Sequence, residues 1–141
     1  MAITAAICNS FKVELLAMTP HTAADTYKIA LYPNTATLNK STTAYSNSGE
    51  LATAGNYTQG GIALVGFTVA ADGDAATLDW TTDPSWANAT FTARGALIYN
   101  SSRSNKSVCV LDFGGDITAT AATFTVTLPA AAAATAVIHL S

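Results

Sequence analysis

Hydrophobic residues near the start of the chain recur at helical spacing. Ile7, Phe11, Leu15 and Met18 recur at spacings of four, four and three residues, which places them on one face of a helix. Pro20 cannot continue a helix, so the pattern predicts one N-terminal helix over about 4–17. Its apolar stripe either packs on the chain's own sheet or docks on a partner protein.

From residue 26 onward the hydrophobic period changes to two, the spacing of β-strands. Residues 26–32 alternate and predict a strand with one buried face, whereas 34–60 are polar and predict a long loop with a short strand around 43–46. Residues 62–70 are apolar on both faces, which is typical of a strand buried on both sides, either in the interior of a sandwich or at an interface. Residues 76–80 alternate again and predict another short strand.

The clearest predicted unit is a hairpin in the second half of the chain. A strand over 89–99, a polar loop over 100–106 and a strand over 107–113 follow one another, and Gly114-Gly115-Asp116 is expected to end the second strand. Two further strands are expected at 123–128 and 136–140, with the Ala130–Ala134 run as a linker between them.

These six to eight short strands predict a mainly β fold. The turns between them are too short for crossover helices, so the sheets should be antiparallel. We expect an antiparallel β-sandwich, of which the jelly roll is one form, with one N-terminal α-helix. The 141 residues fit a single domain over 1–141, with the helix at about 4–17 and the sandwich at about 26–141.

The chain carries unusually little charge. Charged residues make up 11% of it, against about 25% in ordinary soluble domains. A weakly charged surface is typical of subunit interfaces, and a Thr-rich solvated sheet is the alternative. The net charge of −3 argues against nucleic acid as a partner, since binding it requires a basic face. No apolar run approaches the roughly 20 residues that span a membrane, and Met1–Ile7 lacks the positive region of a secretory signal, so no membrane partner is expected.

Candidate catalytic chemistry is sparse in the sequence. His21 and His139 lie in no catalytic motif and are expected in a surface turn and at a sheet edge or interface. Asp72-Gly73-Asp74 reads as a turn, because calcium-loop spacing is absent. Cys8 and Cys109 are expected to be small core residues; no metal-binding Cys pattern surrounds them, and whether they form a disulfide depends on a distance that the sequence does not give. We therefore predict no catalytic residue, no metal and no cofactor.

Several residues are better candidates for contacts than for chemistry. Arg94 lies in the middle of a predicted strand, where it either faces solvent, pairs with a cross-strand acid such as Asp112, or anchors an interface. Two tryptophans flank a turn and belong either to the core or to a contact surface. The candidate interface residues are Ile7, Phe11, Leu15, Arg94, Trp80 and Trp86.

Three segments resemble small virion structural proteins of tailed bacteriophages, and the resemblance extends over the whole chain. They are Met1–Lys12 (MAITAAICNSFK), Ala93–Asn100 (ARGALIYN) and Val108–Asp116 (VCVLDFGGD). The resemblance implies a non-enzymatic protein that is assembled in the bacterial cytoplasm and located in the virion. It implies a capsid cement or decoration protein that binds the major capsid protein and copies of itself. The alternative within this class is a tail or fibre-associated component.

Two other classes of protein make different predictions. A carbohydrate or receptor-binding β-sandwich would expose an aromatic patch near Trp80, Trp86 or Tyr57. A small hydrolase would place His21 or His139 beside a carboxylate in a pocket.

Overall fold

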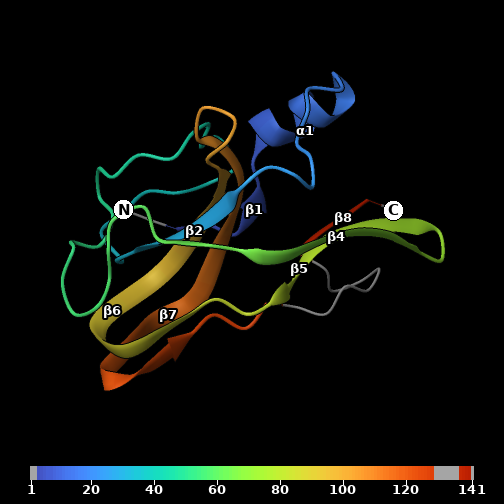
Figure 1. Cartoon of the computed structure of the whole chain (residues 1–141). Coiled ribbons are helices and arrows are strands. Elements are labelled where there is room, and N and C mark those ends of the chain that lie inside the picture. Colours follow the sequence, from blue (N-terminus) through green and yellow to red (C-terminus); the bar gives the residue numbers. More distant parts are fainter. Residues whose placement is uncertain (1–2, 129–136, 141) are drawn as a thin grey trace.

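Two antiparallel sheets and one short helix make up the computed structural model, which describes residues 3–128 and 137–140 (Figure 1). The helix is α1 (Asn9–Leu16). The five-stranded sheet contains, in spatial order, β1 (Ala6–Ile7), β7 (Lys106–Thr125), β6 (Ser85–Asn100), β2 (Tyr27–Tyr32) and β3 (Ile62–Ala63). The three-stranded sheet contains β4 (Val65–Asp72), β5 (Ala75–Thr82) and β8 (Ile138–Leu140). The predicted mainly β, antiparallel, sandwich-like fold with one N-terminal helix is confirmed, and the Ala130–Ala134 run lies outside the described residues.

The predicted hairpin is present as β6 and β7, and both strands are longer than the sequence indicated. Asn100 pairs with Lys106 across the polar loop, as expected. The prediction that Gly114-Gly115-Asp116 ends the second strand is wrong. Gly114 has a φ of +81°, which lets the backbone bulge opposite Arg94 and then continue as a strand to Thr125. Of the separate strand expected at 123–128, residues 123–125 are the last part of β7, and residues 126–128 are not in a strand.

Strand β2, which lies between β6 and β3, is buried on both faces, not on one as predicted. The long loop between β2 and β3 explains the difference, because its side chains pack against the sheet. The Tyr57 hydroxyl accepts a hydrogen bond from the Leu31 backbone N–H, and the Tyr32 hydroxyl donates to the Ser46 carbonyl. The short strand expected at 43–46 is reduced to a single bridge between Ala44 and Lys106.

The segment 62–70 differs most from its prediction. It divides into β3 and β4, which belong to different sheets. Val65 and Val69 are more than half exposed, so the expected burial inside the chain's own sandwich is wrong, and burial at an interface stays a prediction. The β4–β5 hairpin turns at Gly73, whose φ is +60°, and it extends away from the β6–β7 ribbon together with β8 (Figure 1). Few elements therefore cover its faces.

The N-terminal helix begins later than predicted. Ile7 lies in β1 and pairs with Cys109 of β7, and the Cys8 N–H donates to the Val108 carbonyl. These sheet hydrogen bonds hold the backbone extended up to Cys8 and restrict α1 to the eight residues Asn9–Leu16. The helical stripe thus loses Ile7 but keeps Phe11 and Leu15.

Candidate functional site

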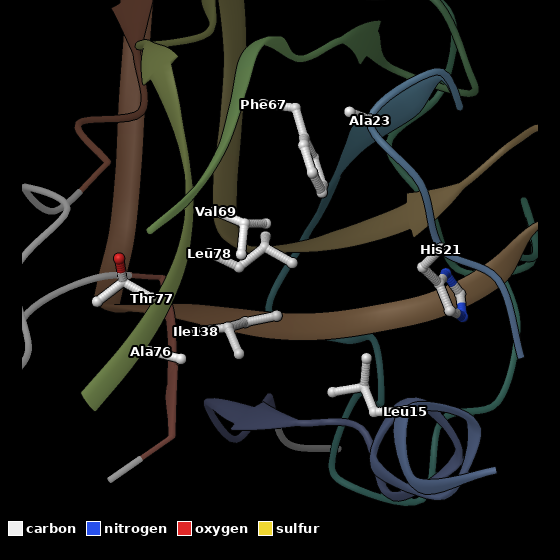
Figure 2. Close-up of a pocket in the computed structure, with 9 residues that line it drawn as sticks. All are labelled: Leu15, His21, Ala23, Phe67, Val69, Ala76, Thr77, Leu78 and Ile138. Atoms are coloured by element: carbon white, nitrogen blue, oxygen red, sulfur yellow. The ribbon is translucent and has the colours of Figure 1, made fainter. Parts of the chain in front are cut away.

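A groove of about 560 Å³ lies between α1 with its following loop and the β4–β5–β8 sheet. In Figure 2 the side chains of Val69, Leu78 and Ile138 lie across this groove from those of Leu15 and His21. The lining residues are mostly apolar: Leu15, His21, Ala23, Phe67, Val69, Ala76, Thr77, Leu78 and Ile138.

The sheet wall of the groove is one apolar face of the projecting hairpin. Val69 pairs with Leu78 across the two strands, and Leu78 pairs with Ile138 of β8. At the root of the hairpin the Phe67 ring stacks on Tyr27 with centroids 5.0 Å apart, which anchors the hairpin to the main sheet. Two residues further along, Val69 is 61% exposed. The apolar face therefore continues beyond the part that the main sheet covers.

The opposite wall is formed by α1, which has an inner and an outer face. Phe11 is fully buried and Leu15 lines the groove, so the predicted stripe packs inward. Val13 and Leu16 point outward, and Leu16 is 86% exposed. The helix thus presents apolar side chains both to the chain's own body and away from it.

A buried polar cluster connects this wall to the main sheet through His21. The expectation of a surface turn for His21 is wrong, because its side chain is only 1% exposed. Its Nε2 lies 3.1 Å from Glu14 Oε1, and its Nδ1 lies 3.2 Å from Asn100 Nδ2. Phe11 packs edge-on against the ring at a centroid distance of 4.9 Å. The ring therefore ties α1 to the end of β6.

The orientation of the Asn100 amide fixes the tautomer of His21. Asn100 Oδ1 accepts the Ser102 N–H at 3.0 Å, and Nδ2 donates to Asp25 Oδ2 at 2.9 Å. Nδ2 is therefore a donor toward His21, so Nδ1 of the ring is the acceptor. Nε2 then carries the proton and donates to Glu14. Both ring nitrogens are engaged, and neither offers a free lone pair to the groove.

Two ion pairs complete the cluster. Lys106 Nζ lies 2.5 Å from Glu14 Oε2, and Arg103 Nε lies 3.0 Å from Asp25 Oδ2. The hydrogen bond from Arg103 holds the pKa of Asp25 well below its usual range, although partial burial opposes this. Burial raises the pKa of Glu14, but the hydrogen bonds from Lys106 and His21 outweigh it and leave the pKa lowered. Both carboxylates are thus held in the charged form.

These lowered pKa values predict that acid destabilises the fold. A carboxyl group with a lowered folded-state pKa contributes stability above its ordinary pKa, near 3.8 for Asp25 and 4.5 for Glu14, and loses it as pH falls through the folded-state pKa. Burial raises the pKa of Asp79, so its contribution has the opposite sign and reduces the net slope. We expect the free energy of unfolding, measured by urea titration, to fall between about pH 5 and pH 2.

The matched variants for this pH series are Asp25→Asn and the exposed Asp74→Asn. The first should flatten the pH dependence, and the second should leave it unchanged. A wild-type curve without slope below pH 5, or an Asp25→Asn curve as steep as wild type, would contradict the assignment.

The predicted contact residues are distributed between the core and the groove. Leu15 lines the groove, and Ile7 is half-buried in β1. Trp80 and Trp86 are buried in the core, where the Trp80 ring packs edge-on against Phe67 at 5.9 Å. The two tryptophans therefore belong to the core and not to a contact surface.

Arg94 pairs with Asp112, one of the alternatives that its sequence position left open. Arg94 Nε donates to Asp112 Oδ1 at 3.0 Å, and the Gly114 N–H donates to the same oxygen at 2.9 Å. The hydrogen bond from Arg94 lowers the pKa of Asp112. This pair lies at the β7 bulge and is separate from the groove, which Arg94 does not line.

Cys8, just after β1, and Cys109 on β7 are both buried, as predicted, and both are free thiols, which the sequence left open. Burial raises the pKa of each thiol. Residues 3–128 and 137–140 hold no group of three or more His, Cys, Asp or Glu side chains that could bind a metal ion. In the same residues, no helix is long and apolar enough to cross a membrane.

The groove is suited to apolar contact more than to acid–base chemistry. His21 does lie beside a carboxylate at a groove, the arrangement that a hydrolase would need, but both of its ring nitrogens already have partners. The Thr77 hydroxyl donates to the Ala70 carbonyl at 3.2 Å. The side chain of His139 lies outside the described part of the chain, and its backbone pairs with Thr77 in β8.

The aromatic patch expected of a carbohydrate-binding module is not exposed at the predicted residues. Trp80, Trp86 and Tyr57 are all buried. Comparison with protein-family models, with curated proteins and with solved structures gave no match. The functional argument therefore depends on the groove and the surface around it.

Sequence reasoning missed most of the groove. Val69, Leu78 and Ile138 were expected to be ordinary strand residues, because alternation shows that a face is apolar and not whether anything covers it. The apolar character of both faces over 62–70 was the available signal. This pattern is compatible with a strand buried inside the chain and with a strand that contacts another molecule.

Proposed function

We propose that this chain is a structural protein of a tailed-bacteriophage particle that acts as a capsid cement, binding the major capsid protein lattice and stabilising the head. One observation carries its role as a contact-making protein. Of the six exposed large hydrophobic residues in the described part of the chain, five belong to or directly follow the two elements that form the groove walls: Val65 and Val69 on β4, and Val13, Leu16 and Met18 on or just after α1.

Single exposed hydrophobic residues are normal on protein surfaces, whereas a cluster marks a site of interaction. Here the cluster borders a groove whose lining is nearly uncharged, which matches the low charge of interface cores. The assignment to a phage particle, and to the head within it, is supported by the sequence resemblance of the segments Met1–Lys12, Ala93–Asn100 and Val108–Asp116.

The test compares purified particles of the phage that encodes this chain with particles that lack it. We expect the protein at a fixed stoichiometric ratio to the major capsid protein, on the head surface in electron micrographs. Particles without it should lose infectivity at a lower temperature, and adding the purified protein back should restore heat tolerance. A location in the tail would favour the tail or fibre-associated alternative. Absence from particles, or unchanged heat tolerance without it, would overturn the cement role.

A further inference from the structure

We propose that the groove and its exposed rim are a self-association surface, in which the β4–β5 hairpin of one copy packs against the outer face of α1 of a second copy. The inference rests on the proposed structural role and names the partner that covers this surface. Two uncovered apolar surfaces motivate it: Val65 and Val69 on β4, and Val13 and Leu16 on α1.

The two surfaces are complementary in charge. The hairpin and its flanks, residues 65–82, contain no lysine or arginine; of their three aspartates Asp79 is buried, and Asp72 and Asp74 are exposed at the tip. The outer face of α1 carries Lys12 one helical turn before Leu16. The single acid of the helix, Glu14, is already bound by His21 and Lys106. The hairpin is therefore acidic and apolar, and the outer helix face is basic and apolar.

A second cation strengthens the positive end of the helix. The Asn9 N–H donates to the Lys40 carbonyl at 2.7 Å, and Lys12 Nζ reaches Asn9 Oδ1 at 3.5 Å. Lys12 and Lys40 are thus close in space, and both are exposed. In the described residues neither lysine forms an ion pair with an acid of its own chain. Both remain available to an acidic surface.

The spacings of the two surfaces are compatible. Four residues of helix from Leu16 back to Lys12 span about 6 Å, and three residues of strand from Val69 to Asp72 span about 10 Å. The flexible lysine side chain covers the difference of about 4 Å between these spans. When Leu16 of one copy contacts Val69 of another, Lys12 therefore comes within reach of the acidic hairpin tip.

A second copy is the simplest partner with both properties. Any partner that covers the hairpin must be apolar and basic, and any partner that covers α1 must be apolar and acidic. The chain itself presents each surface once, so contacts between copies cover both without another protein. Most soluble homo-oligomers have closed symmetry, and a closed arrangement covers both surfaces of every copy.

The first test measures the oligomeric state of the purified full chain by light scattering and native mass spectrometry over a concentration series. We expect a wild-type oligomer, and monomers for Leu16→Asp and Val69→Asp. Ile117→Asp is the matched control, because Ile117 is 45% exposed on β7 and does not line the groove. It should associate like wild type. A monomeric wild-type chain at all concentrations would overturn the proposal, as would equal effects of all three variants.

The second test exchanges the charges. Asp74→Lys and Lys12→Asp should each weaken association by about tenfold, since like charges then meet. An equimolar mixture of the two variants should associate again, because the lysine of one faces the aspartate of the other. Circular dichroism checks that each variant is folded. Folded variants whose mixture stays monomeric would contradict the contact.

These results are separable from the test of the particle role. Oligomeric state is measured on the isolated chain, and heat tolerance is measured on particles. If the chain self-associates but is absent from particles, the contact between copies is supported and the cement function is refuted. If the chain is monomeric but restores the heat tolerance of particles, the cement function is supported and the contact between copies is refuted.

Discussion

Replacing Glu50 with alanine is expected to lower the free energy of unfolding by about 3–5 kcal/mol, because one buried and one partly buried tyrosine hydroxyl lose a charged acceptor. The Glu50 carboxylate accepts hydrogen bonds from the Tyr45 hydroxyl at 2.6 Å, the Tyr57 hydroxyl at 2.5 Å and the Gly60 N–H at 2.8 Å. Burial and the adjacent carboxylate raise the pKa of Tyr57, so its hydroxyl stays protonated and remains a donor.

This network also attaches the loop between β2 and β3 to the sheet. The Tyr57 hydroxyl accepts from the Leu31 N–H, and the Tyr99 hydroxyl donates to the Gly60 carbonyl at 2.7 Å. The loss in Glu50→Ala should therefore be accompanied by faster hydrogen exchange in the loop. Equilibrium urea unfolding gives the magnitude.

Two milder variants control for this effect. Tyr45→Phe removes one hydrogen bond of the same network and should cost about 1 kcal/mol. Glu50→Gln keeps the side-chain shape and one acceptor oxygen, so its effect should lie between those of the other two. If Glu50→Ala is no more destabilising than Tyr45→Phe, the carboxylate is not the centre of the network.

Asn100→Ala is expected to cost about 2–4 kcal/mol, because it leaves a cavity at a fully buried position and removes the partner of three polar groups at once. Asn100 is fully buried, and its amide joins His21, Asp25 and the Ser102 N–H. The substitution leaves His21 Nδ1 without its donor. Urea unfolding at neutral pH measures the loss of stability, and nitrogen-15 NMR of the imidazole measures the loss of the fixed tautomer.

The matched control is Asn34→Ala. Asn34 is exposed and makes one side-chain hydrogen bond, to Asp116 Oδ2 at 2.9 Å, so its loss should cost less than about 0.5 kcal/mol. A second variant, Asn100→Asp, would place a carboxylate against Asp25 and should be destabilised at neutral pH by charge repulsion. Equal stability of Asn100→Ala and Asn34→Ala would show that the cluster does not couple α1 to the sheet.

Local patterns predicted the kinds of element correctly. Alternation identified β2, β5 and the β6–β7 hairpin, because the side chains of a strand point to opposite faces at every second residue. Helical spacing identified α1 but not its start. The start depends on hydrogen bonds from Cys8 to Val108, a partner that no local pattern can name. The continuation of β7 past Gly114 likewise depends on its pairing with β6.

The sequence by itself determined a sparsely charged, mainly β chain with an N-terminal helix, since composition and periodicity are properties of neighbouring residues. Only the tertiary structure decided which apolar faces are covered and which polar groups meet. His21 and Asn100 are 79 residues apart, and Asp25 and Arg103 are 78 residues apart. The apolar pattern of 62–70 is the same whether the strand is buried in its own core or exposed to a partner. Burial depends on the other elements that pack on a face, so the groove became visible only when α1 and the β4–β5 hairpin were placed side by side.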